Sequence, residues 1–195
     1  MSKALLAVFA IVLLVGGYSV WEFRAKMGDA RLGSDVTYTI DAQGNAAVEM
    51  VNKSYFTDAS VEKNFDGMVS RLGRPDPESF RKGLEESLKK LSEKTGREYV
   101  VSDFDAAFER HPEYGAQVYR FRWSGFAEER DGVWVVDFKA ASSVKLNKDS
   151  ALTVVLPEGV TMVRAKPAPT AGDGKTRLVW TGAAEMAWPF IEYRR

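Results

Sequence analysis

The feature that most constrains this chain is an apolar run near its start that carries no ionisable side chain. Residues 4–21 read ALLAVFAIVLLVGGYSVW. At about 1.5 Å per residue, a helix over this run is about 27 Å long, close to the hydrocarbon thickness of a bilayer. A helix in water needs a polar face, which this run lacks. We therefore predict a transmembrane anchor with its flank over residues 1–27, in contact with lipid through residues 4–21.

Two other interpretations of the run stay open. In a cleaved signal peptide, Val15 and Gly17, or Gly17 and Ser19, would occupy the positions before the cut. In a pilin-like subunit, a leader would be cut between Lys3 and Ala4, and the hydrophobic helix would pack into a filament. We favour the retained anchor, because the apolar run continues past both signal-peptide sites and lacks the acid that pilin-like helices often carry near their start.

The charges that flank the run bear on its orientation. Lys3 precedes it, whereas Arg24, Lys26 and Arg31 follow it. Counted by the positive-inside rule, these charges favour a cytoplasmic body. A three-residue tail before an apolar run is, however, the usual layout of an exported anchor. We therefore expect a single-pass protein of the cell membrane whose body is extracellular.

The remainder of the chain has the size of one domain. We predict a connector over residues 28–34 and a single soluble β-rich domain over residues 35–195. The 27 basic and 27 acidic side chains cancel to a net charge of +0. Proteins that bind nucleic acid need a basic excess to neutralise phosphates, so we expect no nucleic-acid partner.

The sequence is very poor in cysteine and histidine, which excludes several classes of catalytic and metal site. The sequence has 0 cysteines and 1 histidine, His111. Disulfides, thiolate metal sites and thiol nucleophiles are therefore excluded, and histidine-based triads and metal sites lose their usual ligand or base. His111 lies in a predicted turn. We expect no catalytic residue, no metal and no cofactor.

The apolar pattern has two periods. Residues 36–40 and 46–50 alternate between apolar and polar side chains around a loop with Gly44, which predicts a β-hairpin. Residues 61–72, before Gly73, then follow a helical period. A second helix starts at Asp76–Pro77 and ends at Gly96.

Strand patterns return after this helix, at Tyr119 to Trp123, Trp134 to Phe138, Leu152 to Leu156, Val160 to Ala165, Leu178 to Trp180 and Trp188 to Tyr193. Clean alternation is typical of antiparallel sheets. We predict an α+β fold: a mostly antiparallel β-sheet or sandwich, with two amphipathic helices inserted after the first hairpin and one N-terminal transmembrane helix.

Several of these segments carry a resemblance to a known family. The stretches VTYTIDAQGNAAVE, YRFRWSGFAE, ALTVVLPEGV and TRLVWTG resemble an uncharacterised family of membrane-anchored domains found in archaea. The resemblance covers about two thirds of the chain. It implies an exported β-rich body on a single helix, and it brings no activity, substrate or site residue.

One group of carboxylates is a candidate for catalysis. Asp103, Asp105 and Glu109 lie on a predicted strand, where i,i+2 spacing points Asp103 and Asp105 to one face. Paired carboxylates act as acid and base in glycoside hydrolysis. Arginines on the same and the following strand offer the alternative of cross-strand ion pairs. An enzyme built on this pair is our least favoured hypothesis.

The candidate interaction surface lies near the C-terminus. Pro189 indicates that the last strand is either an edge strand or a bulged one. We take the strand from Glu185 to Tyr193 as the candidate edge, because edge strands are open to pairing with a partner. We expect Trp188 to be the exposed indole there, although most aromatic side chains should fill the core. The interaction residues are Trp188, Pro189, Phe190 and Tyr193.

One further motif bears on the location of the domain. Asn52-Lys53-Ser54 forms an N-glycosylation sequon, which is meaningful if the body is extracellular. Together these features favour a membrane-anchored, non-enzymatic module whose partner is an envelope protein or a surface polymer. The alternatives are the pilin-like filament subunit and, last, a carboxylate-dependent hydrolase.

Overall fold

The computed structural model describes residues 30–137 and 144–195. The predicted anchor over residues 4–21 and the strand end at Phe138 lie outside the described residues. Among the described residues, no helix combines the length and the apolar character needed to cross a membrane.

The first hairpin opens the domain, as predicted. Strand β1 (Arg31–Ile40) pairs antiparallel with β2 (Ala46–Tyr55) over its whole length. The loop between them depends on Gly44, whose φ is 80°, a region in which a side chain is disfavoured. Because β1 begins at Arg31, residues 31–34, predicted as connector, lie in the strand.

The two predicted helices follow the hairpin. Helix α2 (Ala59–Leu72) begins after Asp58, whose side chain accepts hydrogen bonds from the first turn, and ends at Gly73. Helix α3 (Pro77–Thr95) begins after Asp76 and ends at Gly96 in the left-handed conformation. Both C-terminal glycines supply the positive φ that closes a helix. The predicted ends at Gly73 and Gly96 and the predicted start at Asp76–Pro77 are confirmed, whereas α2 begins two residues before the predicted Val61.

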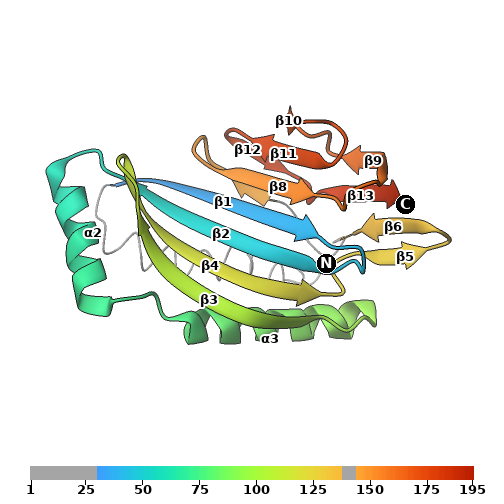
Figure 1. The fold of residues 1–195 in the computed structure, drawn as a ribbon, viewed down its shortest axis with the longest axis horizontal. Coiled ribbons are helices and arrows are strands. Elements are labelled where there is room, and N and C mark those ends of the chain that lie inside the picture. The colour runs from blue at the N-terminus through green and yellow to red at the C-terminus, as the bar shows by residue number, and fades with distance from the viewer. Residues whose placement is uncertain (1–29, 138–143) are drawn as a thin grey trace, which may run out of the picture.

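The hairpin is the centre of a large sheet. It also contains β3 (Val100–Arg110), β4 (Tyr114–Ser124), β8 (Ala151–Val155), β10 (Ala171–Gly172) and β11 (Arg177–Thr181). Its order is β10-β11-β8-β1-β2-β4-β3, and Figure 1 shows its long, curved strands. The β1–β8 pairing is parallel, whereas the other pairings of this sheet are antiparallel. The mostly antiparallel α+β class is confirmed.

Two smaller sheets complete the described domain. The four-stranded sheet comprises β5 (Glu128–Arg130), β6 (Val133–Val136), β13 (Phe190–Arg194) and β9 (Thr161–Lys166), in the order β5-β6-β13-β9. The two-stranded sheet pairs β7 (Val144–Leu146) with β12 (Ala184–Met186).

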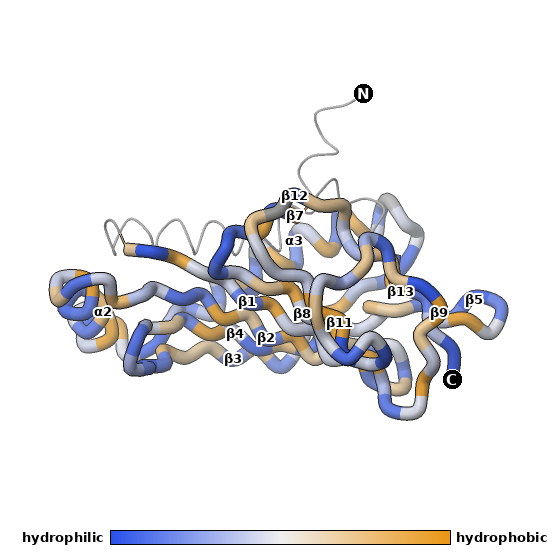
Figure 2. The backbone as a smooth tube through the Cα atoms, turned by 90° about the horizontal axis from the view of Figure 1, so that it is seen from above, coloured by the Kyte–Doolittle hydropathy of each residue, from blue (hydrophilic) through white to orange (hydrophobic). Residues whose placement is uncertain are grey.

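The main core lies on one face of the large sheet, here called the inner face. Tyr38 and Trp123 of this face pack in one cluster with Leu84 of α3 and Ile191 of β13, and each is at most 1% exposed. A second cluster around Phe65 docks α2 at the far end of the sheet. Figure 2 shows α2 at one end of the molecule and β5, β9 and β13 at the other.

The C-terminal strand is not an edge, which corrects that part of the prediction, whereas its pairing with β9 shifts register between Glu192 and Tyr193, in agreement with the alternative of a bulged strand. β13 lies between β6 and β9 and pairs with both. Pro189 comes before Phe190, the first residue of β13, so it does not interrupt the ladder. Trp188 is 9% exposed and Tyr193 is 0% exposed, because they join the core rather than face solvent. The predicted exposed indole is therefore wrong.

The docking of α2 gives a first prediction. A Cβ atom on Gly115 would lie 2.4 Å from ring carbons of Phe65, the buried anchor of α2. We expect Gly115→Ala to lower the free energy of unfolding by about 1–3 kcal/mol through overpacking, measured by urea denaturation. A Cβ atom on Gly67, on the exposed side of α2, would meet no other atom within 4 Å. Gly67→Ala is the control and should stabilise the domain slightly. Equal stability of both variants would contradict this packing.

Candidate functional site

The outer face of the large sheet, here called the wet face, carries a two-row array of polar side chains. One row runs from Thr37 through Glu49 to Arg120, and the next runs from Thr39 through Ala47 to Arg122. These side chains alternate with the core residues of the same strands, and each is exposed or half-buried. The alternation that predicted the strands thus also produces this polar face.

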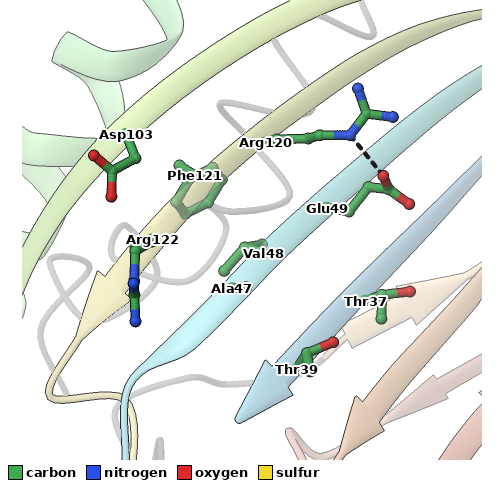
Figure 3. Close-up of a pocket in the computed structure, with 9 residues that line it drawn as sticks. All are labelled: Thr37, Thr39, Ala47, Val48, Glu49, Asp103, Arg120, Phe121 and Arg122. Carbon is green, nitrogen blue, oxygen red and sulfur yellow. Dashed lines mark hydrogen bonds and ion pairs between the residues drawn. The ribbon is translucent and has the colours of Figure 1, made fainter. Parts of the chain in front are cut away.

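A shallow hollow of about 400 Å³ lies over this array. Its lining comes from β1, β2, β4 and β3, and Figure 3 shows Thr37, Thr39, Ala47, Glu49, Asp103, Arg120 and Arg122 around it. Ala47 and the two threonines are short, which leaves space between the longer side chains. The hollow is open to solvent, so it presents hydrogen-bonding groups without excluding water from a reaction.

Arg120 holds two glutamates of this face. Its Nε donates to Glu49 at 2.8 Å, and its Nη2 donates to Glu109 at 2.7 Å. The hydrogen bonds from Glu109 and then Glu49 raise the pKa of Arg120 above its ordinary value. Pairs this exposed contribute under about 1 kcal/mol each to stability. Because both glutamates are engaged, neither is a free acid or base.

Arg122 is bound at the hairpin loop. Its Nη2 donates to Asp41 at 3.0 Å, and Asp41 also accepts from the backbone N–H groups of Gln43 and Asn45. Partial burial by itself raises the pKa of Asp41. The hydrogen bonds from Asn45 and Gln43 and the charge of Arg122 together outweigh burial and lower that pKa below its ordinary value.

This lowered pKa makes a pH-dependent prediction. The stability that the Asp41 carboxylate contributes is present above the unfolded-state value of about 3.9 and is lost as the pH falls through the lower folded-state pKa. We expect Asp41→Asn to reduce the free energy of unfolding by about 1 kcal/mol at neutral pH, with a gap that closes in acid. Urea denaturation of both proteins from about pH 2 to 7 measures this. A pH-independent gap would contradict the assignment.

Strand β3 forms a free edge of the large sheet next to β4. A β-bulge interrupts it, since Asp103 and Phe104 together stand opposite one residue of β4. Phe104 stacks inward on Phe121 at 5.0 Å between ring centroids. Asp103 is the extra residue: its φ is 55°, and its side chain lines the wet-face hollow.

The bulge changes how the predicted carboxylate group is arranged. Asp105 pairs in register with Arg120, a wet-face residue, so Asp103 and Asp105 both lie on the outer side, although not through regular i,i+2 spacing. Glu109 lies about 13 Å further along the strand and is bound by Arg120. The three carboxylates therefore do not converge. Among the described residues no group of three or more metal-ligating side chains comes together.

A second depression, the β3–α3 groove, runs between the start of β3 and helix α3. It has a volume of about 280 Å³ and is lined by Glu85, Leu88, Lys89, Ser92, Tyr99, Val100 and Val101. Leu88 and Tyr99 are buried, whereas Val100 is 47% exposed. The groove is therefore apolar, with one acidic and one basic side chain from α3. Sequence reasoning missed it, although the run Tyr99-Val100-Val101 was a signal, because side chains alternate along a strand and one face cannot bury all three.

The remaining sequence candidates lie elsewhere. His111 occupies the β3–β4 turn, as predicted, and stacks on Tyr114 at 4.4 Å between ring centroids. Asn52 is 1% exposed, and its Oδ1 accepts a hydrogen bond from Ser34 at 3.0 Å. This burial contradicts glycosylation of Asn52, because a glycan has no room on the inner face. The alternation that places Val48 and Met50 inward also places Asn52 there.

The fold and its surface define a β-rich α+β domain with shallow polar and apolar depressions. The chain belongs to the DUF4897 family, a domain of unknown function, which matches residues 31–194. The expected membership of an uncharacterised family is confirmed, while archaeal origin and membrane anchoring stay predictions. Comparison with curated proteins gives no match. Among solved structures, the NMR structure of the folded domain of LppM from Mycobacterium tuberculosis aligns at 11% identity with a TM-score of 0.41, over 84% of this chain and 89% of that chain.

Proposed function

We propose that this protein is a non-enzymatic interaction module, held at the outer side of the cell membrane by a single helix over residues 4–21. The observation that carries the proposal is the β3 edge: a strand of 11 residues that pairs with β4 on one side, with no described strand on the other. Unpaired backbone groups along a strand are a template for association. The β3–α3 groove lies beside the start of this edge.

The arrangement of the carboxylates supports binding over catalysis. Glu49 and Glu109 are occupied by Arg120, and Asp103 and Asp105 are exposed on an open edge. General acid–base catalysis by two carboxyl groups relies on different environments that separate their pKa values. It also relies on an active site that excludes water. An open edge of this kind is better suited to binding an envelope protein than to hydrolysing a bond.

Site-specific crosslinking in intact cells tests the interaction. A photoreactive amino acid is placed at Asp105 on β3 and, as a control, at Glu158, an exposed turn residue outside the edge. We expect a discrete crosslinked adduct from position 105 and none from position 158. If positions 100, 105 and 107 all fail to give an adduct, the interaction function is refuted.

Extraction and protease protection test the membrane part of the proposal. The full-length protein is expected to stay with membranes in alkaline carbonate and to be digested by protease added to intact cells. Leu13→Arg places a charge in the centre of the run, which costs about 2.5–3.5 kcal/mol of insertion, and should release protein into the soluble fraction. N-terminal sequencing separates the alternatives: an intact Met1 or Ser2 supports the anchor, whereas a start at Ala4 or Leu5 supports a filament subunit.

A further inference from the structure

The charge of the β3 edge restricts what can bind there. Asp103 and Asp105 are exposed, and among the described residues neither forms an ion pair. Arg120, the register partner of Asp105, is already bound by two glutamates. An added strand that passes Asp103 and Asp105 therefore meets two uncompensated negative charges.

This charge also selects against self-association. Two β3 edges paired with each other would bring carboxylates of one copy near those of the other, and like charges across a strand pair are destabilising. Proteins use charges and bulges in this way to keep free edges from joining. A strand with basic side chains meets no such repulsion and instead forms cross-strand ion pairs, so the same feature excludes one partner and favours another.

The backbone and the groove supply the rest of the recognition. From Asp105 to Arg110, β3 pairs with β4 in unbroken register. The free edge of β3 therefore offers regularly spaced backbone N–H and C=O groups over six residues, about 20 Å. At the other end of the strand, Leu88, Tyr99 and Val101 face the β3–α3 groove on the inner side. A strand added to the edge thus has a charged side toward the wet face and an apolar side toward α3.

We propose that the β3 edge binds an extended segment of a partner protein in which basic and apolar residues alternate, added as a strand beside β3. The basic side chains pair with Asp103 and Asp105, and an apolar side chain at one end enters the β3–α3 groove. This inference rests on the proposed interaction function and specifies its partner. It belongs to the recognition mode in which main-chain hydrogen bonds supply affinity and alternate side chains supply specificity.

A peptide-binding experiment tests the charge requirement. The probe is a fluorescent nine-residue peptide of alternating lysine and valine, titrated with the full-length protein in detergent while anisotropy is recorded. We expect Asp103→Asn with Asp105→Asn to weaken binding at least fivefold; asparagine tolerates the positive φ at residue 103. The control, Glu129→Gln with Glu158→Gln, removes the same charge from exposed sites outside the edge and should bind as the parent does.

N-methylated peptides test strand addition itself. In a β-ladder only alternate N–H groups of the added strand point to the edge. One peptide methylated on alternate nitrogens should therefore lose binding, and its counterpart methylated on the other set should keep it. Equal binding of the two peptides, or unchanged binding by the double asparagine variant, overturns the inference. Because crosslinking at position 105 in cells reports any partner, its persistence in that case would leave the interaction function standing.

Discussion

Replacing Trp123 with alanine is expected to lower the free energy of unfolding by about 3–5 kcal/mol, the range for removing a large aromatic side chain from a core. Trp123 is 1% exposed. Its ring meets Tyr38 of β1, Tyr99 before β3, and Phe126 after β4 in edge-on contacts, with centroid distances of 6.4, 6.3 and 5.2 Å. The substitution therefore removes one side chain that joins three separate segments of the domain.

Urea denaturation followed by circular dichroism measures this loss. The matched surface control is Val163→Ala on β9, where the side chain is 49% exposed and the change should stay within about 0.5 kcal/mol. Trp123→Phe keeps an aromatic ring and should fall between the two. A Trp123→Ala protein that unfolds at the same urea concentration as the Val163→Ala protein would show that this aromatic cluster is not a core.

The role of Trp123 is one that the sequence could predict. Tyr119, Phe121 and Trp123 alternate with polar residues, and alternation assigns them to one buried face without knowledge of any partner strand. All three are buried. Helix α3 was predictable for the same reason, because its caps, Asp76 and Gly96, act within a single turn of chain. Features decided by residues close in sequence are thus visible before the fold is known.

Which strands lie at the edges of a sheet is decided by pairing partners that are distant in sequence. A proline before a strand is compatible with an edge, but β13 became internal because β9, over 20 residues earlier, pairs with it. The bulge at Asp103 likewise depends on the register that β4 adopts against β3. The motif at Asn52 misled for a related reason. A sequon is defined by three consecutive residues, whereas the side chain of Asn52 is buried because its position in β2 points it to the inner face of the sheet. The candidate site could therefore be located only after the strand order was known.

The parallel pairing of β1 with β8 depends most on contacts distant in sequence. Asp35 to Thr39 pair in register with Ala151 to Val155, and nothing in either segment distinguishes a parallel from an antiparallel neighbour. The turn that precedes β8 lies against β1: the backbone N–H of Ser34 donates to Ser150 Oγ at 2.9 Å, and Asn147 Nδ2 donates to the carbonyl of Leu32 at 3.1 Å. This close approach requires a residue without a side chain at position 33.

Gly33→Val is accordingly expected to be the second most damaging change. A Cβ atom at Gly33 would lie 2.3 Å from the carbonyl oxygen of Asp149, a backbone atom that cannot turn aside as a side chain would. Overpacking costs about 1–3 kcal/mol, and loss of one of the two turn hydrogen bonds adds about 1 kcal/mol. We expect a total loss of about 2–4 kcal/mol in the free energy of unfolding.

Hydrogen exchange separates this local cause from general destabilisation. Amides of β8 should lose protection in Gly33→Val more than amides at the β2–β4 pairing, because the turn before β8 is what the new side chain displaces. Gly33→Ala carries the same Cβ atom and should show the same pattern with a smaller loss. If Gly33→Ala keeps the stability of the parent and full protection in β8, then the turn does not lie against β1, and the parallel placement of β8 beside β1 is incorrect.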